Sequence, residues 1–356
     1  MIQLGSTIKE IAKLAGVSRG TVDRVIHNRP GVSPKIREQV QQILREAKYE
    51  PNTAAVALKS TVRNLTIGVI IPDLRNEFFC SVYEGIQEAS HRYRGYGVMV
   101  EEYRMEDSTG AELVRGIDTL MEKGIDALAL QAIDVPLVRN RLAALPDIPL
   151  VTFNSDLADS HRICFVGQDA FAAGKVAGRM MRLYLRRRGA VAVIIGRSAL
   201  THQMERVQGF DSVMKTSSLV SEFLGPVEIR ESDSVAYDTT RKLLRDRPDL
   251  TGIYAAGGGQ KGIAAALADS ERAREVIMIG HDLLPKTVEY LNAGVVNCTI
   301  AQGPYVQGYL PVEILAEYLL FRREPESEKM YTTVDIRIKE NVAFQGIALS
   351  RAEHGR

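Results

Sequence analysis

The chain has few cysteines and lacks a long apolar run. Its three cysteines, Cys80, Cys164 and Cys298, lie far apart in 356 residues and form neither a CxxC pair nor the spacing of a metal site. We therefore expect reduced thiols in the protein core. No stretch approaches the roughly 18 apolar residues that span a bilayer, and the first residues, MIQLGSTIKE, lack the apolar run of a secretory signal. These absences predict a cytoplasmic protein without a membrane anchor.

Common catalytic signatures are also absent. The sequence contains no HExxH and no GxSxG motif, and none of its cysteines has a clear histidine partner. We therefore expect neither an enzyme nor a bound metal or other cofactor.

Positive charge is concentrated at one end of the chain. Residues 1–60 contain ten Lys and Arg against five Asp and Glu, a net charge of +5. The whole chain has a net charge of +1, so the remaining residues carry −4. A small basic segment on a mildly acidic body favours a segment that meets phosphate and a body that does not.

Residues 7–26 predict two short helices joined by a tight turn. Thr7 and the glutamate three residues later have the T-x-x-E spacing of a capping box, and Gly16 permits the left-handed conformation that ends a helix. Ser18 is a suitable N-cap for the second helix. Apolar residues recur every three or four positions, so each helix has one buried face. The other face of the second helix and its end carry polar side chains, namely Arg19, Thr21, Arg24 and His27.

A third helix is predicted after Ser33 and Pro34, with a core stripe that includes Ile36, Val40 and Ile43. Three helices in this order form a DNA-binding pattern, because the second helix fits the major groove and Arg and Thr can bond there to base edges and phosphates. An ordinary helical bundle with a solvated basic face is the alternative.

From Leu65 onward, apolar runs of strand length alternate with amphipathic helical stretches. The first series starts with LTIGVIIPD and continues to PLVTFNSD, and a second series follows HRICFVGQD. Such alternation predicts parallel sheets with helices on both faces. Two similar α/β halves imply a cleft between them, and ligands of such sheets bind beyond the carboxyl ends of the strands.

The sequence is recognisable in both parts. Residues 6–60 resemble the headpiece of the LacI/GalR family of bacterial transcriptional regulators, in TIKEIAKLAGVS, TVDRV, VSPKIREQV and YEPNTAAVALKS. The body resembles periplasmic sugar-binding proteins of the ribose-binding type, in FNSD, VQGF and TIAQ.

The resemblance implies an all-α helix-turn-helix headpiece followed by an α/β body of two doubly wound parallel-sheet subdomains, the type I periplasmic-binding-protein fold. The expected boundaries are 1–49 for the headpiece, 50–64 for a hinge helix and linker, 65–342 for the body and 343–356 for a tail. Within the body we expect subdomain 1 at about 65–165 and 300–325, and subdomain 2 at about 166–299 and 326–342.

The resemblance also implies DNA contacts and an assembly. It implies a homodimer, or a tetramer formed by two dimers, on a palindromic operator in double-stranded DNA. Leu58 matches a leucine that unstacks a base step in the minor groove; a plain linker whose leucine packs on the body is the alternative. Gly20 replaces a base-reading side chain of some relatives, so the preferred half-site should differ. The expected DNA-binding residues are Thr7, Ser18, Arg19, Gly20, Thr21, Arg24, His27 and Leu58.

Several residues after the predicted strands match ligand-binding positions of the sugar-binding proteins. Asn76 matches a ligand of sugar hydroxyls. Phe78 and Phe79 match aromatics that stack on the apolar faces of a sugar, with core packing as the alternative. Gln131 also follows a predicted strand, at the end of ALALQ.

Three further matches come from the second half of the body. Arg206 matches an arginine that can bond to two oxygens, although a surface charge is the alternative. Asp282 matches a carboxylate that accepts two hydroxyl hydrogens, and Gln302 matches an amide ligand.

Three positions depart from the family pattern. Asn154 and Ser155 replace an Asp-Arg pair, which weakens the case for ribose itself. Gly257 stands where the family often has Asn, and leaves either more room or only backbone N–H groups. The expected effector is therefore a sugar or polyol, larger than ribose or differently substituted.

A nucleotide remains the alternative ligand. Residues 257–262, GGGQKG, satisfy G-x-G-x-x-G between a predicted strand and helix, and Asp282 lies 20 residues beyond Gly262. This arrangement matches the dinucleotide-binding pattern, in which glycines let a pyrophosphate approach a helix N-terminus. It would suit a regulator that senses NAD, or a dehydrogenase.

Overall fold

The computed structural model describes residues 8–26, 31–46 and 64–342. The first two segments contain the helices α1 (Ile8–Ala15), α2 (Arg19–Ile26) and α3 (Pro34–Glu46). The expected turn signals are confirmed: Gly16 has a φ of 64°, and the Val17 N–H donates to the Ala12 carbonyl at 3.0 Å, which closes α1. The Ser18 hydroxyl accepts from the Thr21 N–H at 3.1 Å and caps α2. Residues from all three helices form one small apolar core, which includes Ile11, Val22, Val25 and Val40.

The first subdomain is built on a six-stranded sheet in the order β11-β5-β4-β3-β1-β2, and every neighbouring pair is parallel. Its elements are β1 (Leu65–Ile71), α5 (Glu77–Arg94), β2 (Val98–Arg104), α6 (Gly110–Glu122), β3 (Ala127–Leu130), α7 (Pro136–Ala143), β4 (Leu150–Phe153), η1 (Ala158–Ser160), β5 (Cys164–Gln168), α13 (Pro304–Phe321) and β11 (Lys329–Thr332).

The second subdomain has a six-stranded sheet in the order β12-β10-β9-β8-β6-β7, in which only the β10–β12 pair is antiparallel. Its elements are α8 (Ala170–Tyr184), β6 (Gly189–Ile195), α9 (Thr201–Met214), β7 (Val220–Glu228), α10 (Asp233–Asp246), β8 (Leu250–Ala255), α11 (Gln260–Ala268), β9 (Ile277–His281), α12 (Pro285–Asn292), β10 (Cys298–Ala301) and β12 (Asp335–Arg337).

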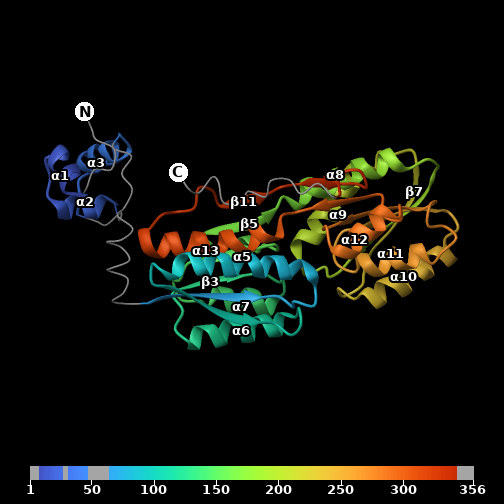
Figure 1. Ribbon diagram of the computed structural model, residues 1–356, viewed down its shortest axis with the longest axis horizontal. Helices are drawn as coiled ribbons and strands as arrows, with labels where there is room; N and C mark the ends of the chain where they lie inside the picture. Colours follow the sequence, from blue (N-terminus) through green and yellow to red (C-terminus); the bar gives the residue numbers. More distant parts are fainter. Residues whose placement is uncertain (1–7, 27–30, 47–63, 343–356) are drawn as a thin grey trace.

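Helices cover both faces of each sheet (Figure 1). In the first subdomain, one apolar core lies under α5 and α13 and a second lies under α6 and α7. In the second, α8 and α9 cover one core, and α10, α11 and α12 cover the other. The inner strands β1, β3, β4, β6 and β8 are nearly continuous apolar runs because both of their faces are buried. The predicted doubly wound architecture is confirmed.

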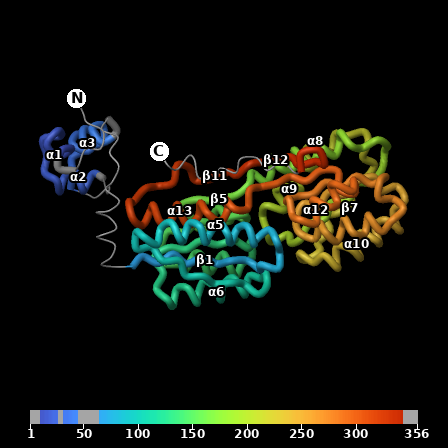
Figure 2. The backbone as a smooth tube through the Cα atoms, viewed as in Figure 1, coloured from blue at the N-terminus to red at the C-terminus, as the bar shows by residue number. Residues whose placement is uncertain are grey.

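The chain passes between the two subdomains three times (Figure 2). The passages follow β5, β10 and β11, since α13 packs on the first sheet after β10 leaves the second. Our assignment of residues 326–342 to the second subdomain is wrong for β11, which pairs with β5 in the first sheet. A short alternating segment predicts a strand, but it does not show which strand pairs with it. That partner depends on where the chain passes between the subdomains.

The cysteines only partly match the expectation of core thiols. Cys164 and Cys298 are buried and free, and burial raises the pKa of the Cys164 thiol to about 11. Cys80, however, is exposed near the start of α5. Among the described residues, no helix is both long and apolar enough to cross a membrane.

Candidate functional site

A cavity of about 500 Å³ lies between the two subdomains. Its lining comes from segments that follow β1, β2, β3 and β4 of the first sheet and β6, β7, β8, β9 and β10 of the second. Carboxyl ends of parallel strands from both sheets therefore face one space, as expected for a ligand site in this class of fold.

Nine of the ten predicted effector residues line this cavity. The first subdomain contributes Asn76, Phe78, Phe79, Gln131 and Asn154. Arg206, Gly257, Asp282 and Gln302 follow or lie near strands of the second subdomain. The tenth, Ser155, is absent from the lining.

A chain of amide side chains runs across the floor of the cavity. The Gln131 Nε2 donates to Asn154 Oδ1 at 2.6 Å, and the Asn154 Nδ2 donates to Gln307 Oε1 at 3.0 Å. The Gln307 Nε2 donates to the Gln302 carbonyl at 2.8 Å, and Gln302 Nε2 donates to Asp282 Oδ1 at 2.7 Å. The chain thus links residues after β3 and β4 to residues after β9 and β10. These contacts hold each polar group in a defined orientation before any ligand arrives.

Arg206 is buried at the centre of this network, with 2% of its surface exposed. Its Nη1 donates to the Ala256 carbonyl at 3.2 Å and its Nη2 to Gln302 Oε1 at 3.0 Å. Burial lowers the pKa of Arg206, while the charge of Asp282 opposes that change. The Nε of Arg206 is buried without a hydrogen-bond partner. A buried donor without a partner is costly, so this atom is available to a ligand oxygen.

Asp282 is the carboxylate partner of Arg206 across the Gln302 amide. Burial raises its pKa, and Arg206 and the Gln302 hydrogen bond act against that rise. Asp282 and Asn154 both have a left-handed backbone, with φ of 71° and 60°. Such a conformation is uncommon for residues other than glycine, although Asp and Asn tolerate it best. Both side chains reach the cavity from these turns.

The two phenylalanines belong to the core and to the cavity at once. Phe78 and Phe79 pack edge to face, with ring centroids 5.1 Å apart, and both are buried in the core under α5. Both also line the cavity. Asn76 caps α5 by accepting from the Phe78 N–H at 3.1 Å. This cap uses its oxygen and leaves its amide hydrogens for a ligand.

Two histidines complete the second-subdomain wall. His202 and His281 are buried, and burial holds the pKa of each well below its usual range, so both rings are neutral at pH 7. The His281 Nε2 lies 2.7 Å from the Tyr254 hydroxyl. The Nδ1 atoms of both histidines are buried without a partner. A neutral ring has one N–H donor and one acceptor nitrogen, which suits ligand hydroxyls.

The DNA-binding prediction rests on α2 in the described part of the head. Arg19, Gly20 and Arg24 are exposed, and Ser18 and Thr21 pair through their hydroxyls at 2.9 Å. Val22 and Val25 point into the head core from the same helix. The exposed basic face is therefore opposite the buried one. Thr7, His27, Leu58 and residues 50–63 of the expected hinge helix and linker lie outside the described residues.

Known proteins match both parts of the chain. Residues 7–52 match the family described as bacterial regulatory proteins of the lacI family, and residues 67–323 match the periplasmic binding protein domain. The chain belongs to the lacI family of bacterial regulatory proteins.

Relatives of this regulator support the same assignment. The ribose operon repressor of Halalkalibacterium halodurans is 26% identical over 291 residues, which cover 79% of this chain and 81% of that protein. Catabolite control protein A of Staphylococcus epidermidis is 25% identical over 245 residues, or 68% and 71% of the two chains. The lacI-family regulator is therefore a ligand-controlled transcriptional regulator and not an enzyme.

A solved structure shows the fold of the body independently. GanP, a glucose-galactose binding protein from Geobacillus stearothermophilus, superimposes with a TM-score of 0.71 at 24% identity. The match covers 79% of the regulator and 100% of GanP.

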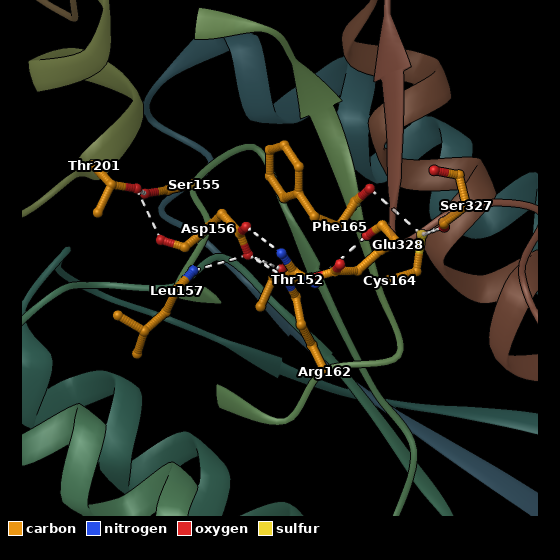
Figure 3. Close-up of polar contacts among 10 residues, drawn as sticks. All are labelled: Thr152, Ser155, Asp156, Leu157, Arg162, Cys164, Phe165, Thr201, Ser327 and Glu328. Atoms are coloured by element: carbon orange, nitrogen blue, oxygen red, sulfur yellow. Dashed lines mark hydrogen bonds and ion pairs between the residues drawn. The ribbon is translucent and has the colours of Figure 1, made fainter. Parts of the chain in front are cut away.

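Ser155 of the regulator is buried and does not line the cavity, and its side chain faces Thr201 (Figure 3), so the structure gives no support to the expected effector contact. Its Oγ lies 3.2 Å from the Thr201 Oγ1, and Thr201 in turn donates to the Asp156 carbonyl at 2.8 Å. The left-handed turn at Asn154 directs the next side chain toward α9 instead. The pair joins the first subdomain to the start of α9 in the second.

The surroundings of the glycine run oppose a phosphate site in the regulator. A side chain on Gly258 would collide with the carboxylate of Glu231. At the start of α11, Asp233 Oδ1 already accepts from the Gly262 N–H at 3.2 Å. A pyrophosphate at this helix N-terminus would meet two carboxylates, so the charge opposes a dinucleotide there.

Sequence reasoning missed several residues that line the cavity of the regulator, among them His202, Gln203 and Glu231. His202 and Gln203 precede Arg206 by four and three positions in α9, and residues at this spacing share a helix face. That spacing could have identified them once Arg206 was placed. Gln203 also fills the space beside Gly257, so of the two expected alternatives the one that remains is that Gly257 offers only backbone groups.

Proposed function

We propose that this lacI-family regulator is a repressor whose DNA binding is controlled by a neutral sugar or polyol bound between the two subdomains. The observation that carries the proposal is the composition of the cavity. Amides, a buried arginine, a half-buried aspartate and two neutral histidines offer donors and acceptors, and Phe78 and Phe79 offer apolar rings. A sugar has the matching hydroxyl rim and apolar faces.

The regulator binds a palindromic operator in double-stranded DNA as a homodimer, in the cytoplasm. One small head offers a single short helix to the major groove, and two symmetric heads match two half-sites. Ligand control then requires that the effector bind two conformations of the body with different affinity, because only a differential affinity can shift their populations.

A ligand screen on the full chain tests the effector class. Thermal unfolding would be followed with sugars, polyols, sugar phosphates, NAD and purines. At a hundredfold excess over Kd, a bound ligand stabilises the folded state by about 2.7 kcal/mol. We expect stabilisation by a neutral sugar or polyol and a change in DNA affinity with the same compound. Stabilisation by NAD or a purine alone would overturn the proposed class.

The Arg24→Ala variant tests the DNA-binding face. Arg24 is exposed on α2, opposite the core residues Val22 and Val25. Loss of a base or phosphate contact should weaken binding by about 1–3 kcal/mol, or lower the salt dependence by about one ion. Binding would be measured at two salt concentrations on a duplex that the wild type selects from random DNA.

Lys35→Ala is the matched control for Arg24→Ala. It removes one exposed positive charge from α3 of the same head. We expect a smaller loss of affinity than for Arg24→Ala. Unchanged binding of Arg24→Ala at both salt concentrations would contradict the assignment of α2 to the groove.

A further inference from the structure

Three glycines beside the cavity make room for two polar side chains. A Cβ on Gly196 or Gly258 would collide with the carboxylate of Glu231, and a Cβ on Gly257 would collide with the amide of Gln203. The three glycines follow β6 and β8, whereas Glu231 follows β7 and Gln203 lies on α9. Four segments of the second subdomain therefore converge on this pair.

The backbone determines how Gln203 is oriented. Its Oε1 accepts from the Gly196 N–H at 2.7 Å and from the Arg197 N–H at 3.1 Å. The amide nitrogen must then face the other way, where it donates to Glu231 Oε1 at 2.7 Å. The glutamate is thus held at one oxygen by a side chain that cannot reverse.

Glu231 reaches the cavity from an unusual backbone. Arg230 and Glu231 both have left-handed φ, of 54° and 59°. Two consecutive non-glycine residues in this region are costly, and such strain is characteristic of functional sites. Glu231 lines the cavity, and burial raises its pKa. Within the described part of the chain, no cation lies at ion-pair distance from its carboxylate.

The charges that line the cavity balance without a charged ligand. Arg206 and Asp282 are linked through the Gln302 amide, at 3.0 and 2.7 Å. Arg197 also lines the cavity, and its charge acts on Glu231 to oppose the rise in the pKa of that carboxyl. Across the lining as a whole, six Arg and Lys side chains stand against six Asp and Glu side chains. A phosphate or carboxylate on the ligand would disturb this balance in a poorly solvated site.

We propose that Glu231 is a ligand-binding and specificity-determining residue that accepts hydroxyl hydrogens of the sugar or polyol and excludes analogues with an anionic group at this end. The assignment rests on the proposed function and narrows its ligand to neutral compounds. The Oε2 of Glu231 is the acceptor, because Oε1 is bonded to Gln203. The three glycines and Gln203 hold the carboxylate in place.

Titration of the full chain with paired ligands tests the assignment. D-ribose, D-glucose and D-galactose would each be compared with their terminal phosphate esters by calorimetry. The wild type should prefer one neutral sugar over its phosphate. In Glu231→Gln, a size-matched change, we expect about 10- to 100-fold weaker binding of that sugar and a smaller preference over the phosphate.

Two further variants separate charge from fold. Glu228→Gln removes an exposed carboxylate three residues earlier, which bonds to Ser198 outside the cavity, and should leave binding and preference unchanged. Glu231→Asp keeps the negative charge but shortens the side chain by one methylene. The affinity for the neutral sugar should therefore fall, while the phosphate ester should still bind more weakly than the sugar. DNA binding without sugar reports that each variant is folded.

The outcomes separate this assignment from the broader proposal. A wild type that binds a neutral sugar, with Glu231→Gln identical to it in affinity and preference, overturns the role of Glu231 alone. Tighter binding of a sugar phosphate by the wild type also overturns it and leaves sugar control intact. Binding of none of the compounds, with stabilisation by NAD or purines instead, overturns both.

Discussion

Asp282→Ala should abolish the response of the regulator to its effector and leave operator binding intact. The carboxylate of Asp282 is one of the few fixed acceptors in the cavity, and only its Oδ1 is occupied by Gln302, at 2.7 Å. A carboxylate that receives two hydroxyl hydrogens contributes about 1.5–3 kcal/mol for each bond, which corresponds to a loss of affinity on the order of 100-fold or more. The measurement is release or retention of operator DNA during titration with the sugar found in the screen.

Asp282→Asn separates the lost charge from backbone strain. Asp282 has a φ of 71°, where alanine is strained but asparagine is tolerated. We expect both variants to lose the response. Asp269→Asn, which changes an exposed carboxylate of the same subdomain, is the control. A full response of Asp282→Asn to the cognate sugar would place the site elsewhere.

The polar network indicates how occupancy of the cavity can reach the rest of the body. Gln302 lies where the chain passes from β10 to α13, that is, from the second subdomain to the first. It contacts Arg206 and Asp282 on one side and Gln307 on the other. A ligand that changes the hydrogen bonds of Gln302 therefore acts where the chain passes between the subdomains. Such a position suits a change in their relative orientation, which is the kind of two-state element that ligand control requires.

Much of the cavity could be predicted from sequence because of one geometric rule. Parallel strands bring their carboxyl ends to one edge, so polar residues just after apolar runs gather there. Gln131 follows from this rule alone. Asn154, Asp282 and Gln302 also follow predicted strands, but their choice came from the resemblance to sugar-binding proteins; all four line the cavity. The rule depends only on local patterns, which the sequence displays.

Other features depend on tertiary geometry and could not be predicted in this way. Ser155 directly follows Asn154, but its hydroxyl bonds to Thr201 and not to the cavity. The left-handed backbone of Asn154 changes the direction of the Ser155 side chain. Glu231 has no distinctive neighbours in the sequence, and its place beside the cavity becomes apparent only when glycines from two other strands leave room for it. β11 reads as a short alternating strand with no preference for either sheet.

Arg162→Met should destabilise the regulator more than any surface charge change. The Arg162 side chain is 1% exposed and binds Asp156 through two nitrogens, with Nε–Oδ1 of 2.6 Å and Nη2–Oδ2 of 2.7 Å (Figure 3). Its Nη1 also donates to Glu328 Oε1 at 3.0 Å, just before β11. Removing one partner of a buried pair leaves an uncompensated charge, which typically costs about 3–5 kcal/mol.

The second half of this test identifies the cause of the loss. Asp156 also accepts from the Thr152 hydroxyl at 2.7 Å and the Leu157 N–H at 2.9 Å, so Asn at this position keeps part of the network. We expect the double variant Arg162→Met, Asp156→Asn to recover part of the stability, because no buried charge remains unpaired. Arg139→Met, which breaks an exposed pair with Asp134, should change stability little. The free energy of unfolding would be measured by denaturant titration of the full chain. A change below about 1 kcal/mol in Arg162→Met, the range of exposed pairs, would mean that the pair does not hold the β4–β5 connection against β11.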